Sequence, residues 1–264
     1  MKKNPEGVRK SLSWLRATND VEQELKSVTA FVESSTNVSC RFKDLFTNPT
    51  YRRPFLVSMT LLCLQKFTGY FTLLAYQTVI LPKNLGVLTS ENCTQISGVI
   101  ILLSTFLASH LMDIAGRRIL LFVCHTGITI FMGILGVLFL LNSTKHIDVG
   151  DYSYLLVLSF VGYVFSYSIG VGPIAPLYIG EVLPQAAKGT AGPSIALMSS
   201  IASAGNTFVF AVTASYVGMH WNFFCFAGFS VLSLFFTYFF IAETKNRDFQ
   251  DIQEAFKHKN ASKA

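Results

Sequence analysis

The sequence predicts an all-α membrane protein with six transmembrane helices. Of its 264 residues, 51% are hydrophobic and only 14% are charged, whereas about a quarter of the residues in soluble domains are charged. The apolar residues also fall into blocks of roughly 20, the length that an α-helix needs to cross a bilayer. One such block could be a buried helix of a soluble protein, but six blocks joined by short loops favour a membrane protein.

The six apolar blocks follow one another through most of the chain. The expected spans cover residues 54–81, 96–112, 119–141, 154–179, 193–217 and 221–242. Each block is long enough to cross a bilayer with some tilt. The chain therefore divides into an N-terminal segment with short helices (1–53), a transmembrane domain (54–242) and a C-terminal tail (243–264).

Lysine and arginine predict the orientation of these spans. Six spans leave both ends of the chain on one side of the membrane, and 18 of the 21 basic residues lie on that side. Only Lys83 and Lys145 lie in the opposite loops, and Lys66 lies inside the first span. Because positive residues stay inside, we expect a multi-pass protein of the cell (plasma) membrane with both termini in the cytoplasm. The net charge of +6 then reflects topology and is no evidence for nucleic-acid binding.

Two sequons fall in the predicted outer loops. Asn92 and Asn142 each head an Asn-x-Ser/Thr triplet, which is the acceptor pattern for glycosylation. Both are therefore glycosylation candidates.

The first span carries polar residues at helical spacing. Gln65, Gly69, Thr72 and Tyr76 lie at i, i+4, i+7 and i+11, which would put them on one face of a helix. Lys66 lies beside them near the middle of the bilayer, where a lysine costs about 2.5–3.5 kcal/mol. We expect it to face a cavity, water or a partner, and snorkelling toward an interface is the alternative.

The fourth span contains helix-disrupting residues. Gly170, Gly172, Pro173 and Pro176 lie in its middle. Proline removes a backbone donor and glycine relaxes the chain, so this helix should kink or open. Interrupted helices with freed carbonyls are typical of transporter pathways.

The fifth span repeats the polar pattern with Ser199, Ser203 and Asn206. Its small residues would also permit close helix packing, so pathway lining and simple packing both remain open for this span.

The sequence gives no sign of an enzyme. It has no nucleophile–base pair and no phosphate-binding loop, and its five cysteines and five histidines lack metal or redox spacing. We therefore expect no catalytic residues, no metal and no cofactor. A seven-helix receptor does not fit six spans with both tails in the cytoplasm.

Several motifs together resemble the sugar porters of the major facilitator superfamily. Residues 113–118 (DIAGRR) resemble the family's acid-x-x-Gly-Arg-Arg loop, and residues 172–189 resemble its Gly-Pro run that ends in Glu-x-x-Pro. Residues 64–77 resemble the Gln-Gln-x-x-Gly-x-Asn signature, and residues 242–252 resemble the Pro-Glu-Thr-Lys-Gly tail. Residues 11–25 are similar to the linker before the seventh helix, particularly in insect trehalose and hexose carriers.

This resemblance implies a fold and a function. Residues 54–242 would form helices seven to twelve, one half of a major-facilitator-type bundle, and residues 1–53 would be the linker before it. Such a bundle carries a small neutral sugar such as trehalose or a hexose by alternating access. Its partners would be the lipid bilayer and a six-helix N-terminal half. The chain would then be an incomplete gene model, a truncated isoform or a half-transporter that pairs with another chain.

The resemblance also implies site residues. The substrate pathway would contain Gln65, Lys66, Gly69, Thr72, Tyr76, Gly172, Pro173, Ser199 and Asn206. A cytoplasmic charge latch that holds the inward side shut would contain Asp113, Gly116, Arg117, Arg118, Glu181, Lys188 and Glu243.

Most sugar-contact positions depart from the family pattern. Lys66 replaces a Gln, Phe71 and Ile101 replace Asn, Ser168 replaces an acid, Pro176 replaces a Trp, and Ser199 and Ser200 stand where Asn-Trp is common. Only Gln65 and Tyr76 clearly match. A site that recognises hydroxyl groups by hydrogen bonds loses discrimination when the side chains that make those bonds are replaced. Two alternatives therefore stay open: a carrier of a different, anionic solute, and a non-transporting membrane sensor or partner subunit.

Overall fold

The computed structural model describes residues 5–16, 22, 41–81, 84–85, 88–144, 152–243 and 245. Most of the predicted linker and of the C-terminal tail lies outside these residues. The elements are α1 (Pro5–Arg16), α3 (Asp44–Thr47), α4 (Pro49–Phe67), α5 (Tyr70–Ala75), α6 (Gln77–Ile80), β1 (Asn84–Leu85), β2 (Leu88–Thr89), α7 (Ser90–Ala115), α8 (Arg117–Ser143), α9 (Ser153–Ser166), the π-helix η1 (Tyr167–Val171), α10 (Gly172–Val182), α11 (Gln185–Tyr216) and α12 (Met219–Phe240).

The described residues confirm the predicted all-α membrane fold. Five helical stretches are long and apolar enough to cross a bilayer: Glu91–Ala115, Arg117–Ser143, Ser153–Val182, Gln185–Tyr216 and Met219–Phe240. They correspond to the second to sixth predicted spans, and their ends lie within a few residues of the apolar blocks except at Gln185, where the helix begins well before the predicted fifth span. The only sheet among the described residues is the two-stranded antiparallel β1–β2, which pairs Asn84 with Thr89 and Leu85 with Leu88.

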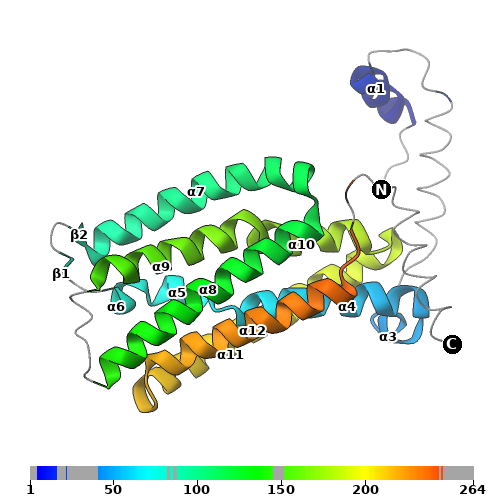
Figure 1. The fold of residues 1–264 in the computed structure, drawn as a ribbon. Coiled ribbons are helices and arrows are strands. Elements are labelled where there is room, and N and C mark those ends of the chain that lie inside the picture. The colour runs from blue at the N-terminus through cyan, green and yellow to red at the C-terminus, as the bar shows by residue number, and fades with distance from the viewer. Residues whose placement is uncertain are drawn as a thin grey trace.

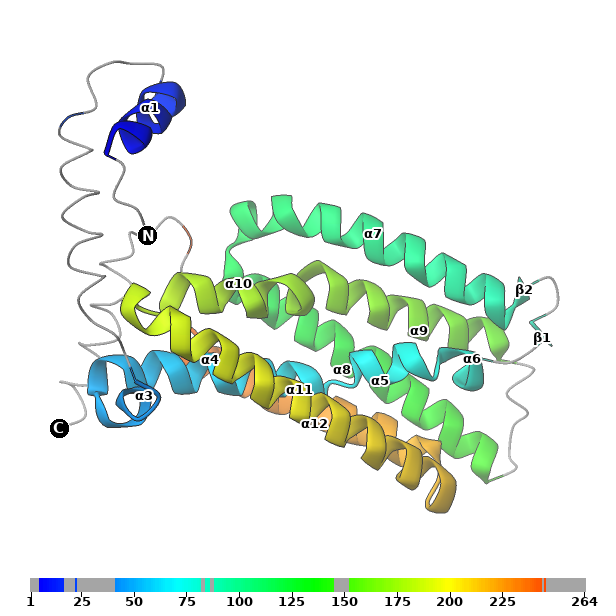
Figure 2. The same ribbon diagram turned by 180° about the vertical axis from the view of Figure 1, so that it is seen from behind.

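The first predicted span is not one continuous helix, so that expectation was wrong. It is divided into α4, α5 and α6, with a turn at Thr68 and Gly69. The division follows from the backbone at Gly69, whose φ of 85° is left-handed and cannot continue a right-handed helix. In Figure 2 the three short helices follow one another along the bundle.

The helices form one elongated bundle with its loops at the two ends. Helix α12 packs along α8, α8 also contacts α9, and α11 packs on α4. Helices α7 and α11 lie on opposite sides of the bundle in both views, with the α4–α6 segment between them (Figures 1 and 2). Helices α7 and α11 carry exposed large apolar side chains outside the hollows described below, including Leu102, Phe106 and Val209. Such surfaces suit contact with lipid or with another helical layer.

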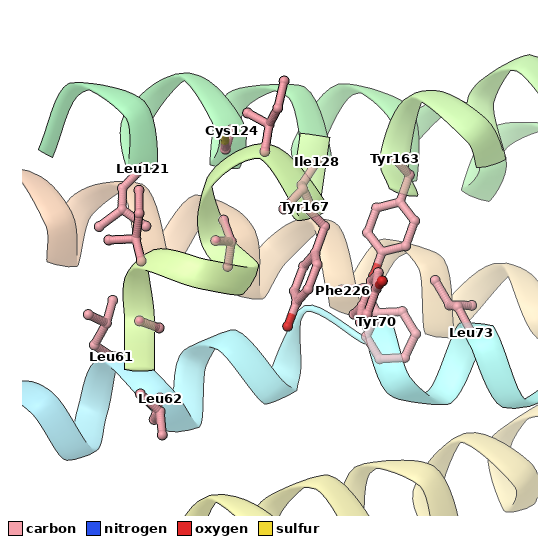
Figure 3. Packing of buried hydrophobic residues seen from close by; sticks show 14 of the residues in the cluster. Leu61, Leu62, Tyr70, Leu73, Leu121, Cys124, Ile128, Tyr163, Tyr167 and Phe226 are labelled. Atoms are coloured by element: carbon pink, nitrogen blue, oxygen red, sulfur yellow. The ribbon is translucent and has the colours of Figure 1, made fainter. Parts of the chain in front are cut away.

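The core lies where the broken first span meets the fourth span and α12. The rings of Tyr70 and Tyr167 stack with their centroids 3.7 Å apart, and Tyr163 is fully buried beside them (Figure 3). Phe226 of α12 completes this cluster and is 3% exposed. The break in the first span is therefore held by aromatic packing from two other helices.

The fourth span widens where the prolines were expected to open it. The chain stays helical from Ser153 to Val182, but residues Tyr167–Val171 form a π-helical turn. The N–H of Gly172 donates to the carbonyl of Tyr167, five residues earlier, which is the π-helical pattern. Single π turns of this kind occur inside α-helices, often at functional sites.

Candidate functional site

The break between α4 and α5 depends on glycine at position 69. Besides its left-handed φ, a Cβ atom built at Gly69 would lie 2.6 Å from ring carbons of Phe226. Any other side chain would meet both a backbone penalty and a steric clash. Gly69 thus marks the point where the chain leaves α4 and turns into α5.

Gln65 connects this break to the fourth span. Its side-chain Nε2 donates to the carbonyl oxygens of Val171 at 2.9 Å and Gly172 at 3.2 Å. In an α-helix the Gly172 carbonyl would accept from the residue four positions later, which is Pro176 and has no N–H. Gln65, which is 5% exposed, therefore supplies the donor that the proline removed.

Asn206 connects the same break to α11. Its Nδ2 donates to the Lys66 carbonyl at 3.2 Å and lies 3.4 Å from the Thr72 hydroxyl. The Thr72 and Thr207 hydroxyls are hydrogen-bonded at 2.9 Å. Polar groups of the first and fifth predicted spans thus meet directly, a contact that fits both pathway lining and simple helix packing.

Several residues at this junction were missed by the sequence reasoning. The Tyr163 hydroxyl donates to the Thr68 carbonyl at 3.1 Å, so a third helix also satisfies the broken backbone. Tyr163 and Tyr167 lie four residues apart, which does indicate one helical face. Nothing in the sequence indicates that Tyr70, from another span, stacks on Tyr167.

Four of the nine predicted pathway residues line a hollow of about 390 Å³ between α4, α5, α7 and the fourth span, here called the central hollow. Gln65, Lys66, Gly172 and Pro173 all contribute to it. The positions that depart from the family pattern line the same hollow, namely Lys66, Phe71, Ile101, Ser168 and Pro176. One cavity thus contains most of the positions at which this chain differs from the sugar-binding pattern.

A second hollow, of about 700 Å³, lies between α5 and α11. Lys66 and Phe71 line this hollow as well, together with Tyr76, Ser203 and Thr207. The Lys66 ammonium lies 4.0 Å from the centroid of the Phe71 ring, a cation–π contact. Lys66 thus projects at the boundary between the two hollows, in agreement with the expectation that it faces a cavity.

The structure corrects one expectation about these residues and separates Ser199 from both hollows. Gln65, Thr72 and Tyr76 do not share one helical face, because the chain breaks at Gly69 between them. Ser199 is buried and its hydroxyl donates to the Ala196 carbonyl at 2.9 Å within its own helix. It lines neither described hollow, because the rotation of α11 turns its neighbour Ser200 and then Ser203 toward the second hollow.

The predicted latch residues form a network at the end of the bundle where α8 begins. Arg117 pairs with Glu181 at 3.0 Å, and both side chains are largely buried. The Glu243 carboxylate accepts from the backbone N–H of Arg117 at 3.0 Å and of Arg118 at 3.1 Å. Glu243 therefore caps α8, where the unpaired N–H groups of a helix start favour an anion.

Gly116 allows this cap to approach closely. Its φ is 86°, and a Cβ atom there would lie 2.8 Å from a Glu243 oxygen. Arg118 donates to the Tyr238 carbonyl at 2.7 Å, which adds a second link between α8 and the end of α12. Asp113 is 79% exposed and lies 3.9 Å from Arg117, so its contact is weak.

These contacts connect parts of the same six-helix unit. Arg117, Glu181 and Glu243 hold α8, α10 and the segment after α12 together. The latch was expected to join two helix bundles. A contact with a second bundle would involve residues beyond those that the structure describes. Lys188 is half-buried in the first turn of α11 at the same end of the bundle.

The glycosylation candidates lie at the other end of the bundle. Asn92 is in the first turn of α7 and Asn142 in the last turn of α8, and both are exposed. Both were expected in loops, so each sequon begins inside a helix instead. Within the described residues, no three His, Cys, Asp or Glu side chains come together to hold a metal ion.

Comparison with known proteins identifies relatives over almost the whole chain. The family described as "Sugar (and other) transporter" matches residues 1–256. The facilitated trehalose transporter Tret1 of Bombyx mori is 34% identical over 255 residues, which are 93% of this chain and 48% of that protein. Tret1 of Polypedilum vanderplanki is 33% identical over 258 residues, which are 94% of this chain and 49% of that protein. The chain thus spans about half the length of these relatives.

Solved structures agree on the fold. A double-tryptophan mutant of XylE covers 89% of this chain with a TM-score of 0.71 and 22% identity, and the match covers 48% of that chain. The inward open xylose transporter XylE from E. coli covers 95% of this chain with a TM-score of 0.66 and 20% identity, over 49% of its own length. These likenesses establish a major facilitator fold for the described helices.

Proposed function

The chain belongs to the sugar (and other) transporter family, and we propose that it forms one wall of a pathway that carries a sugar such as trehalose or a hexose. It acts as a membrane carrier and not as an enzyme. The convergence of Gln65, Lys66, Gly172 and Pro173 on the central hollow is the observation that carries this proposal. The hollow lies between the broken first span and the π-helical turn of the fourth span, and irregular helices at a midplane site are typical of secondary transporters.

The local hydrogen bonds suit a site that rearranges. Gln65 satisfies a carbonyl freed by Pro176, and Asn206 donates to a carbonyl at the break in the first span. Both donors are side chains, which exchange partners more readily than backbone groups inside a regular helix. During transport, a sugar hydroxyl would accept from these amide N–H groups or donate to the carbonyl oxygens that they release.

Alternating access requires a second wall that faces the two hollows. We propose that a six-helix N-terminal half supplies it, because a pathway forms between two such halves. The Arg117–Glu181 pair and the Glu243 cap would keep α8, α10 and α12 rigid while this unit rocks. The predicted orientation puts this network in the cytoplasm and the protein in the plasma membrane, with Asn92 and Asn142 outside.

An anionic solute is the second candidate substrate, and Lys66 is the observation that favours it. Its ammonium lies at the boundary of both hollows, and the residues that line them include no carboxylate. A lysine near mid-bilayer costs about 2.5–3.5 kcal/mol, which a bound anion would offset. A carboxylated sugar would suit the sugar-porter scaffold and would pair its carboxylate with the Lys66 ammonium.

Uptake measurements test the proposal and separate the two substrates. We expect no saturable uptake of labelled trehalose or glucose in oocytes by the chain alone, because one half cannot enclose a pathway. Fusion of a family-type first half should produce uptake. In that fusion, Lys66→Gln with Phe71→Asn should raise sugar uptake and lower glucuronate uptake, whereas Lys10→Gln, which removes a charge far from the hollows, should change neither.

Each outcome has a clear meaning. Saturable sugar uptake by the chain alone would contradict the need for a second wall. A fusion that reaches the surface but carries neither solute would contradict the transport proposal and favour the sensor or partner-subunit alternative.

A further inference from the structure

A third hollow, of about 470 Å³, lies between the first half of α4 and the last turns of α12. We call it the α4–α12 groove. Its mouth is lined by Arg52 and Arg53, and its walls by Leu56, Val57, Phe236 and Phe240. These residues belong neither to the family motifs nor to the proposed pathway.

The groove lies on the opposite side of α4 from the central hollow. Each residue turns an α-helix by about 100°, so residues 52, 53, 56, 57 and 60 form one stripe along α4. By the same geometry, Gln65 and Lys66, which line the central hollow, lie roughly 150° and 110° away from the centre of that stripe. The groove therefore opens on a different face of α4 from the central hollow.

Polarity changes with depth along the groove. Arg52 is exposed and Arg53 partly exposed, and both lie at the end of α4 shared with the latch network. Leu56 follows one turn deeper and is 38% exposed. On the other wall, the Phe236 and Phe240 rings stack with their centroids 5.1 Å apart. Two cations at the membrane boundary thus stand above a partly open apolar channel.

We propose that the α4–α12 groove binds an anionic phospholipid. The phosphate and its headgroup lie against the guanidinium groups of Arg52 and Arg53, and an acyl chain lies along Leu56, Phe236 and Phe240. Guanidinium groups match phosphate oxygens in charge and geometry. Basic residues next to a transmembrane helix attract the anionic lipids of the cytoplasmic leaflet, which is the leaflet predicted for this end of the bundle.

Lipid retention by the purified chain tests this proposal. The chain is purified in detergent, mixed with equal amounts of phosphatidylserine and phosphatidylcholine, and examined by native mass spectrometry. We expect phosphatidylserine to be retained preferentially. Arg52→Gln with Arg53→Gln should lower its retention at least fivefold, since each basic residue near the surface contributes a factor of about five.

Two further variants separate specific binding from general charge. Arg41→Gln with Lys43→Gln removes the same charge from exposed positions outside the groove and should leave retention unchanged. Leu56→Trp keeps the charge but fills the groove, and should lower the retention of phosphatidylserine. Inorganic phosphate should not displace the lipid, because it has no acyl chain.

Several results would overturn the proposal. These are equal retention of the two lipids, an equal loss in the control double variant, no effect of Leu56→Trp in a chain that keeps its helical circular dichroism, or displacement by inorganic phosphate. The first two would assign the effect to surface charge, and the last would assign the site to a free anion.

Discussion

Replacing Gly69 by alanine should destabilise the protein strongly, because two penalties act at one atom. A left-handed φ such as the 85° at Gly69 costs a residue with a Cβ about 1–2 kcal/mol. The new methyl group would also lie 2.6 Å from the buried Phe226 ring, and overpacking a core costs about 1–3 kcal/mol. Together these penalties predict a loss of about 2–5 kcal/mol in the free energy of unfolding.

Gly98→Ala is the matched control for this substitution. Gly98 lies inside α7, and a Cβ atom there would have no neighbour within 4 Å. Alanine is favoured over glycine in a helix by about 0.5–1 kcal/mol, so this variant should be unchanged or slightly more stable. The same chemical change is thus expected to have opposite effects at the two positions.

The measurement is SDS-induced unfolding in mixed micelles, followed by circular dichroism. Adding Phe226→Leu to the Gly69→Ala variant should relieve the clash but leave the backbone penalty, so part of the lost stability should return. Equal midpoints for Gly69→Ala and Gly98→Ala would refute the assignment of the first-span break to the conformation of Gly69.

Three other predictions concern the latch network and the topology. Arg117→Ala should lower the free energy of unfolding by about 1–3 kcal/mol, because it removes the charge-assisted hydrogen bond to the largely buried Glu181 carboxylate, whereas Asp113→Ala should change it by less than about 1 kcal/mol at an exposed pair. Glu243→Gln should cost about 1 kcal/mol as a weakened helix cap, seen as a lower thermal midpoint in detergent. A membrane-impermeant maleimide should reach Thr144→Cys on intact cells and Gln185→Cys only after permeabilisation, and the reverse order would contradict the predicted orientation.

Membrane spans could be predicted well because they depend on local composition. A stretch of about 20 apolar residues is favoured in a bilayer wherever its neighbours lie, so five of the predicted spans agree with long helices of the structure. The motifs at residues 113–118 and 172–189 likewise identified the family from short segments, and the family match over residues 1–256 confirms that identification.

Part of the site could also be anticipated from local spacing. The polar residues of the first and fifth spans were expected to line a pathway, and Asn206 does contact the backbone of Lys66. Ser199 lines neither described hollow, because the rotation of α11 about its axis is set by packing against α4, and its place in a pathway stays a prediction. A change of one or two positions along a helix alters the direction of a side chain by 100° or more.

The sequence by itself determined the membrane class, the positions of most spans and the family. Only the tertiary structure decided where the backbone breaks and what satisfies it. Gln65 donates to Gly172, 107 positions later in the chain, and Glu243 caps a helix that begins 126 positions earlier. The energies of such contacts arise only when distant segments meet at hydrogen-bonding distance, so no local pattern of residues encodes them.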